Sequence, residues 1–261
     1  MPEMPPRPAI ADAPLSMILV ACNAELFLDH LLDWWLSALQ SKPRDFEIIL
    51  VDDASTDGTL VQAAAWQKKH PDLTVVSSDS PHGMGAAWRA GLAATKPYPL
   101  VGYAEFSPDY NPDDLSKFLA VIDQVDVVAG IRAIRPSRWS GRGLLERWVF
   151  GVRLADPGCP FKLFRKTVFD HLPLQSRGDF VQTEVVAKAN FLGCLLVEVP
   201  VEYHRTGTSA PDPLWSQDMR LIFRNPDFGP PPTKPGAELE PASTSPTNGT
   251  GIPAPIEDEI L

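Results

Sequence analysis

Cysteine is scarce in this chain of 261 residues, which contains only Cys22, Cys159 and Cys194. Three cysteines without metal-ligand spacing argue against a disulfide framework and a thiolate metal site, so we expect free thiols in a reducing compartment. The chain also lacks an apolar run of the length that crosses a bilayer, about 18 residues or more, and its Pro-rich start lacks the apolar core of a signal peptide. We therefore predict a cytoplasmic protein.

Positive charge is also in deficit. The chain has 23 Lys and Arg residues against 33 Asp and Glu residues, a formal net charge of −10. A protein that binds nucleic acid needs a basic face to neutralise phosphates, so this balance argues against nucleic acid as a partner. Six acidic residues and Lys234 lie in the segment 226–261, which therefore carries −5, half of the net charge.

The two ends of the chain differ in composition from its middle. Residues 1–14 are rich in proline, and residues 226–261 are rich in Pro, Gly, Ser and Thr. Such segments bury too little apolar surface to offset the entropy cost of ordering, so we predict a disordered lead-in and a disordered acidic tail. Between them we expect one folded domain over residues 15–210 and a short C-terminal helix within residues 211–225.

Within that domain, short apolar runs alternate with segments of helical periodicity. The predicted strands are 16–22, 46–51, 73–78, 99–105, 125–132, 159–165 and 194–205. The predicted helices are 24–40, 59–70, 83–96, 112–123, 140–154, 179–193 and 213–224. Alternation of this kind indicates right-handed βαβ crossovers and an α/β fold with a mostly parallel sheet that helices cover on both faces.

Polar side chains follow three of the predicted strands. Asn23 and Glu25 follow the first, Asp52 and Asp53 end the second in "EIILVDDASTDGT", and Glu105 follows the fourth. Ligands of open parallel sheets bind at the carboxyl ends of the strands, where the strand order reverses. Carboxylates there suit a ribose diol, a base N–H group, or a divalent cation that bridges a diphosphate.

Two other nucleotide-binding classes fit the first strand end poorly. The segment "ACNAELF" has no G-x-G-x-x-G, which argues against a dinucleotide-binding Rossmann site. It also lacks the Gly-rich phosphate loop with a basic residue that we would expect of a nucleotidyltransferase.

Several segments, in order and spacing, resemble a family 2 glycosyltransferase of the GT-A fold. The nucleotide-binding half is represented by "ILVACNAE", "EIILVDDASTDGT", "GMGAAWRAGL" and "YAEFSPDYNPDDL". The acceptor half of the dolichol-phosphate mannosyltransferase-like branch is represented by "DPGCPFKLFRK", "FVQTEVVAKANFLG" and "VEVPVEYHRTGTS". The resemblance implies inverting transfer of a sugar from a nucleotide-diphosphate donor, with a polyprenyl phosphate as candidate acceptor.

The resemblance also assigns roles to residues. It implies that the donor is bound by Asn23, Glu25, Asp52, Asp53 and Gly83. The metal motif of the family, Asp-x-Asp followed by Gln, aligns with Glu105-Phe106-Ser107 and Asp109. Glu105 and Asp109 are thus the expected ligands of Mg²⁺ or Mn²⁺ and, with Glu184, the expected catalytic residues.

Ser107 departs from the metal motif, because a serine is a weak neutral ligand where the family has a carboxylate. This departure leaves open a second hypothesis. The chain would then be a catalytically degenerate relative that binds a nucleotide or a partner protein.

Basic residues provide the expected acceptor site, where they would bind a lipid-linked phosphate and the leaving diphosphate. The resemblance implies this role for Arg132, Arg135, Lys162, Arg165 and Arg205. A phosphate acceptor is already anionic and needs no general base. The basic amphipathic segment 140–154 is expected to roof the acceptor cleft or to lie in a membrane interface, so that any contact with the inner face of the membrane is peripheral.

Overall fold

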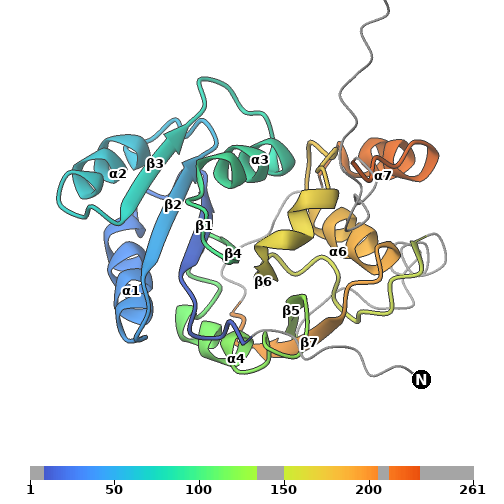
Figure 1. Cartoon of the computed structure of the whole chain (residues 1–261). Helices are drawn as coiled ribbons and strands as arrows, with labels where there is room; N and C mark the ends of the chain where they lie inside the picture. The colour runs from blue at the N-terminus through green and yellow to red at the C-terminus, as the bar shows by residue number, and fades with distance from the viewer. Residues whose placement is uncertain (1–8, 134–149, 205–211, 230–261) are drawn as a thin grey trace, which may run out of the picture. The chain divides into compact units, whose positions relative to one another are not determined.

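A sheet with the strand order β3-β2-β1-β4-β6-β5-β7 forms the centre of the structure, a computed structural model that describes residues 9–133, 150–204 and 212–229 (Figure 1). Its strands are β1 (Leu15–Ala21), β2 (Phe46–Asp52), β3 (Leu73–Ser77), β4 (Leu100–Glu105), β5 (Val127–Arg132), β6 (Lys162–Arg165) and β7 (Leu196–Val201). Among these described strands, β6 alone pairs antiparallel, with β4 on one side and β5 on the other. The predicted α/β fold with a mostly parallel sheet is confirmed.

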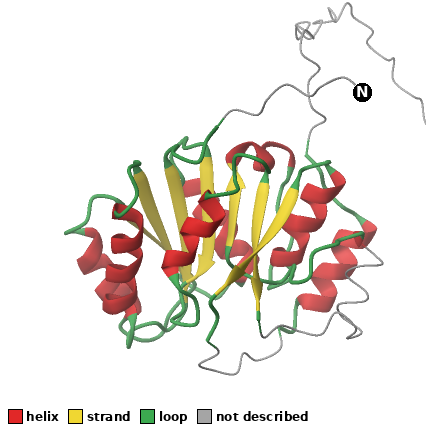
Figure 2. Ribbon diagram, turned by 90° about the horizontal axis from the view of Figure 1, so that it is seen from below, coloured by secondary structure: helices red, strands yellow, loops and turns green. Residues whose placement is uncertain are grey.

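Helices cover both faces of this sheet (Figure 2). They are α1 (Leu28–Gln40), α2 (Thr59–Gln67), α3 (Met84–Ala94), α4 (Leu115–Leu119), α6 (Val181–Phe191) and α7 (Trp215–Arg224), with 3₁₀ turns η1 (Pro112–Asp114) and η2 (Lys166–His171). Side chains of β1 alternate between the faces with a period of two. Met17 and Leu19 pack with α1, α2 and α4, whereas Ile18 and Val20 pack with α3, α6 and α7.

Element boundaries differ from the prediction where polar residues form turns. Helix α1 begins at Leu28 instead of residue 24, because Asn23 adopts a left-handed backbone (φ 53°) and the chain turns before the helix. The predicted helix 140–154 lies mostly outside the described residues, and residues 151–154 are not helical. Residues 1–8 and the tail from 230 onward also lie outside the described residues.

The reversal of strand order lies at β1, which has β2 on one side and β4 on the other. Ala21 pairs with Asp52, and Val20 pairs with Glu105, so the polar residues that follow these strands meet at one edge of the sheet. We call this the carboxyl edge. Among the residues that the structure describes, no helix has both the length and the apolar composition needed to cross a bilayer.

The sheet also contains a buried cation, Lys162, which is 0% exposed. Its ammonium group donates to the carbonyl oxygen of Cys159 and to Oε1 of Gln182 in α6 (3.1 Å). The prediction that Lys162 binds an acceptor phosphate is therefore wrong, because the side chain points into the core beneath α6. Burial lowers the pKa of Lys162 to about 8.

This depressed pKa predicts a pH-dependent stability. The unfolded chain, in which lysine has a pKa of about 10.4, binds more protons than the folded chain between about pH 8 and about pH 10, so Lys162 adds stability as the pH rises through that window. Between about pH 7.5 and about pH 9.5, we expect the free energy of unfolding of the parent to rise by about 2 kcal/mol relative to Lys162→Met. Urea titrations at each pH measure this free energy of unfolding, and Lys69→Met, a substitution at an exposed lysine, is the control. Parallel pH profiles of parent and Lys162→Met would contradict the prediction.

Candidate functional site

The loops that follow β1 and β2 are bound to each other at the carboxyl edge. Oδ1 of Asn23 accepts a hydrogen bond from the amide of Thr56 (2.9 Å), and the amide of Asn23 donates to Oγ of Ser55 (2.8 Å). Oε2 of Glu25 accepts from the amide of Gly58 (2.8 Å). Asn23 and Glu25 thus hold residues 55–58 in place, so in this structure both side chains already serve a structural role.

The two adjacent acids at the end of β2 have different environments. Asp52 is buried, and its carboxylate accepts hydrogen bonds from the amide (3.3 Å) and the hydroxyl of Ser55. Asp53 is half-buried, and its Oδ1 accepts from the amide of His82 (3.1 Å), in the turn before α3. Asp53 is therefore the member of the pair that remains accessible to a ligand.

Gly83 occupies a position that requires glycine. Its φ is +85°, and a Cβ added there would lie 2.5 Å from the carbonyl oxygen of Arg177. A Cβ at Gly85 would lie 2.0 Å from the carbonyl oxygen of Ser176. The turn predicted to bind the donor thus packs directly on the backbone of the segment before α6, a contact that local sequence patterns do not reveal.

A group of carboxylates surrounds the end of β4. Burial raises the pKa of Glu105, and the carboxylates of Asp109 and Asp179 raise it further, while Arg132 opposes the shift. Oγ of Ser107 accepts from the amide of Asp109 (3.2 Å), so the serine of the altered motif supports the turn. Sequence reasoning missed Asp179, which it took as the first residue of a helix.

These acids fit a divalent cation only in part. In the described ranges, no group of three or more His, Cys, Asp or Glu residues lies close enough to hold a metal ion. Glu105 and Asp109 offer the oxygen ligands that Mg²⁺ and Mn²⁺ prefer, and Mg²⁺ often takes its remaining ligands from substrate phosphates and water. The residues therefore fit a cation that a bound diphosphate shares.

Arg132, at the end of β5, is held in one orientation. Its Nε and Nη2 atoms donate to the two carboxylate oxygens of Asp156 (2.8 Å each), and the guanidinium stacks on the ring of Tyr203, 5.4 Å from its centroid. Glu198 in turn accepts from the amide of Asp156 (2.7 Å). Burial alone would lower the pKa of Arg132, but its hydrogen bonds to Asp156 raise the pKa above the usual value.

The structure also contradicts the predicted phosphate-binding role of Arg165. Arg165 pairs with Leu100 at the opposite end of β4 from Glu105, and its guanidinium donates to the carbonyl oxygens of Val125 and Asp123 (3.0 Å each). Arg165 therefore lies at the other edge of the sheet and cannot bind a phosphate at the carboxyl edge. Arg135 and Arg205 lie outside the described residues.

Glu184 is also not placed for catalysis. It is 0% exposed, and its carboxylate accepts from the amides of Gln175 and Ser176 (2.8 Å each) and pairs with Lys188 (2.7 Å). The predicted catalytic role of Glu184 is wrong, because the buried carboxylate already binds two amides of the segment before α6 and the ammonium group of Lys188.

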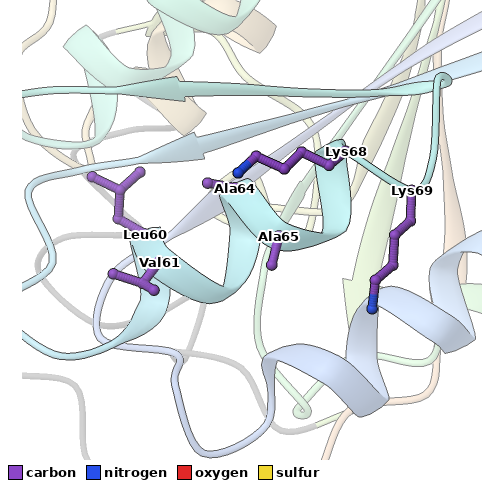
Figure 3. A pocket seen from close by; sticks show the side chains of 6 residues that line it. All are labelled: Leu60, Val61, Ala64, Ala65, Lys68 and Lys69. Carbon is purple, nitrogen blue, oxygen red and sulfur yellow. The ribbon is translucent and has the colours of Figure 1, made fainter.

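A hollow on the outer face of α2 is separate from this group of residues (Figure 3). Its lining consists of Leu60, Val61, Ala64, Ala65, Lys68 and Lys69. The lining contains no carboxylate, so this hollow is not the site that the strand ends form.

Comparison with known proteins agrees with this architecture. The sequence model "Glycosyl transferase family 2" matches residues 16–180. A dodecaprenyl-phosphate galacturonate synthase of Rhizobium johnstonii is 28% identical over 172 residues, which are 61% of this chain and 50% of that protein. An undecaprenyl-phosphate mannosyltransferase of Micrococcus luteus is 24% identical over 185 residues, 64% of this chain and 76% of that protein. The chain thus spans about half the length of the first relative and three quarters of the second.

Solved structures support the fold. The crystal structure of glucosyl-3-phosphoglycerate synthase from Mycobacterium tuberculosis, in complex with Mn²⁺, UDP-glucose and glycerol 3-phosphate, superimposes with a TM-score of 0.59. It is 22% identical and covers 84% of this chain and 79% of the other. The predicted GT-A fold is confirmed. Since the family match extends over more than half of its residues, this chain belongs to glycosyltransferase family 2.

Proposed function

We propose that the chain transfers a sugar from a nucleoside-diphosphate donor to a lipid-linked phosphate of the polyprenyl phosphate class. The observation that carries the proposal is that Asp53 follows β2, Glu105 ends β4 and Arg132 ends β5, all at the same edge of one sheet. The names of the two relatives, which specify dodecaprenyl and undecaprenyl phosphate, support this acceptor class. The UDP-glucose in the similar crystal structure supports the donor class.

The donor would be bound through Asp53. A carboxylate accepts hydrogen bonds from a base N–H or a ribose hydroxyl, and Asp53 is the accessible acid of the pair. Asn23, Glu25 and Asp52 would contribute by fixing residues 55–58 around the nucleotide. Gly83 would let the turn before α3 approach the donor without a side chain.

A divalent cation, Mg²⁺ or Mn²⁺, would be held by Glu105 and Asp109. Burial raises the pKa of Glu105, the carboxylates of Asp109 and Asp179 raise it further, and a bound cation would offset the negative charge of these groups. When bound, such a cation stabilises the negative charge that develops on the departing diphosphate.

Arg132 would bind the acceptor phosphate or the departing diphosphate. An oxygen of the acceptor phosphate attacks the anomeric carbon, and the new C–O bond forms as the bond to the donor diphosphate breaks. The configuration at that carbon inverts, and the nucleoside diphosphate leaves. Asp156 and Tyr203 hold the guanidinium in place, which reduces the reorganisation needed during reaction.

A lipid-linked acceptor also implies that the reaction takes place at a membrane surface. We propose peripheral contact with the inner face of the membrane, close enough for the phosphate of the lipid to reach the carboxyl edge. This contact follows from the acceptor class and depends on it.

The donor site is tested by calorimetry with UDP-glucose and other nucleotide sugars, with and without Mg²⁺ or Mn²⁺. We expect the cation to tighten binding, and Asp53→Ala to weaken it by about tenfold, or about 1.4 kcal/mol, because a charge-assisted hydrogen bond is lost. Asp45→Ala is the matched control, since the exposed Asp45 precedes the same strand at its other end. An equal loss of nucleotide-sugar affinity in the two variants, or no nucleotide binding by the parent, would contradict the assignment of Asp53 to the donor site.

Turnover separates an enzyme from a degenerate relative. The assay measures release of nucleoside diphosphate from the bound donor in the presence of vesicles that contain undecaprenyl phosphate. We expect release that depends on the acceptor. Donor binding without release under either cation would instead favour the hypothesis of a nucleotide-binding relative.

The fixed orientation of Arg132 predicts that lysine cannot replace it. Lys162 is buried, so it cannot take over phosphate binding from Arg132. A lysine at position 132 cannot form the bidentate pair with Asp156, because an ammonium group lacks the planar fork of a guanidinium. We expect Arg132→Lys to lower kcat/KM for the acceptor by about 100-fold. The control is Arg220→Lys at an exposed position of α7. A normal kcat/KM in Arg132→Lys would show that the guanidinium fork is not needed.

A further inference from the structure

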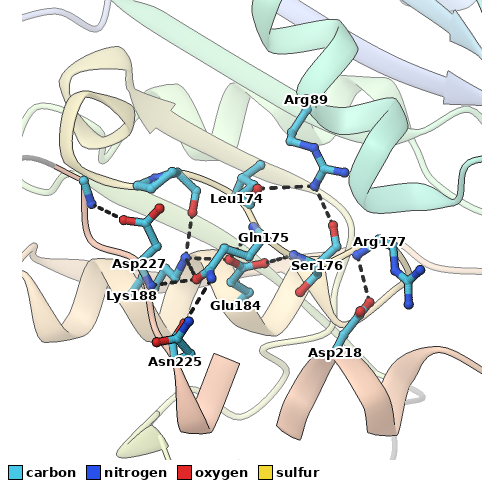
Figure 4. A network of polar contacts seen from close by, with 12 residues as sticks. Arg89, Leu174, Gln175, Ser176, Arg177, Glu184, Lys188, Asp218, Asn225 and Asp227 are labelled. Carbon is cyan, nitrogen blue, oxygen red and sulfur yellow. Dashed lines mark hydrogen bonds and ion pairs between the residues drawn. The ribbon is translucent and has the colours of Figure 1, made fainter. Parts of the chain in front are cut away.

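The 173–178 loop, which joins η2 to α6, is held by charged side chains from three helices (Figure 4). From α3, Arg89 donates to the carbonyl oxygens of Leu174 (3.3 Å) and Ser176 (2.6 Å). From α6, Glu184 binds two amides of the loop and Lys188 donates to the carbonyl oxygen of Pro173 (2.6 Å). The loop thus has little freedom to move relative to these helices.

The third helix is α7, which contributes Asp218. Oδ2 of Asp218 accepts from the amides of Arg177 (2.9 Å) and Gly178 (2.7 Å), and the residue is only 1% exposed. Hydrogen bonds to a buried carboxylate are stronger than neutral ones. Helix α7 lies beyond residue 180, where the match to the family ends, so Asp218 connects a helix outside the matched region to two residues within it.

Arg177, one of the two residues that Asp218 holds, also contacts the turn of the proposed donor site. The carbonyl oxygen of Arg177 accepts from the amide of Gly85 (2.9 Å) and packs against Gly83, where no Cβ fits. The turn continues to His82, whose amide donates to Asp53. A continuous path of short contacts therefore connects Asp218 in α7 with the acid at the end of β2.

The loop also leads to the acids around β4. The residue after Gly178 is Asp179. Its carboxylate contributes to the raised pKa of Glu105, and its amide donates a hydrogen bond to Asp212 (2.8 Å). The position of Gly178 therefore influences where Asp179 lies relative to Glu105. Both sides of the proposed donor site, Asp53 and Glu105, depend on a loop that α7 fixes.

We propose that Asp218 is a positioning residue for the donor site and that α7 is a functional part of the glycosyltransferase domain. This inference rests on the proposed function for its effect on nucleotide affinity, but the structural connection can be measured without it. Loss of the Asp218 carboxylate releases the amides of Arg177 and Gly178, and the turn around Gly83 and its contact with Asp53 become mobile.

The test uses the full chain with Asp218→Ala, the more conservative Asp218→Asn, and Asp123→Ala as matched control. Asp123 also accepts from two loop amides through one oxygen, those of Ile10 (2.6 Å) and Ala11 (2.8 Å), and neither belongs to the proposed donor site. Hydrogen exchange of the amides at 82, 85, 177 and 178 measures the order of the loop and the turn. Calorimetry with UDP and Mn²⁺ measures the donor site.

We expect Asp218→Ala to speed exchange at all four amides by about tenfold or more and to weaken UDP binding by about tenfold. Asp218→Asn keeps an acceptor oxygen and should lie between Asp218→Ala and the parent. Asp123→Ala should speed exchange at residues 10 and 11 and leave the UDP affinity unchanged.

Unchanged exchange at 82 and 85 in Asp218→Ala would overturn the inference. An equal loss of UDP affinity in Asp218→Ala and Asp123→Ala would overturn it as well, because it would show a general loss of stability. If the parent bound no nucleotide, the proposed function would fail, and the exchange at 82 and 85 would alone decide whether α7 positions the turn. Asp218→Asn provides the same readouts if Asp218→Ala does not fold.

Discussion

Hydrogen bonds from loop amides to buried or half-buried carboxylates hold the carboxyl edge of this sheet together. Asp52 binds the amide of Ser55, Glu184 binds those of Gln175 and Ser176, and Asp218 binds those of Arg177 and Gly178. An unsatisfied amide buried beside a sheet costs free energy, and a carboxylate satisfies two at once. The loops of the site are ordered because acids bind them, and the rest of the site depends on that order.

This use of acids divides the carboxylates of the site into two groups. Asp52 and Glu184 are buried and already have their hydrogen-bond partners. Asp53 and Glu105 lie at the same edge but are only half-buried, and burial together with the carboxylates of Asp109 and Asp179 raises the pKa of Glu105. The structure thus separates acids that maintain the shape of the site from acids that can meet a substrate.

The basic residues predicted for the acceptor site also divide into residues at the carboxyl edge and residues with a structural role elsewhere. Arg132 is fixed at the carboxyl edge by Asp156 and Tyr203, whereas Arg165 binds main-chain carbonyls at the opposite edge. Lys162 and Arg165 lie three residues apart in one strand, and residues with that spacing point to opposite faces of a sheet. Lys162 accordingly contacts Gln182 of α6, and Arg165 contacts the chain after α4. Two nearby cations in a sequence are therefore not a cluster in space.

The sequence by itself determined the α/β class, the strands and the polar residues that end β1, β2 and β4, because apolar runs and helical periodicity are local properties. The motifs that resemble family 2 glycosyltransferases also located Asp53 and Glu105 correctly at strand ends. Tertiary structure decided the direction of β6, the burial of Lys162 and Glu184, and the contact of Asp218 with the 173–178 loop. These features depend on which elements pack together, and local periodicity does not reveal that: β6 pairs with β4, and Asp218 binds an amide 41 positions earlier in the chain.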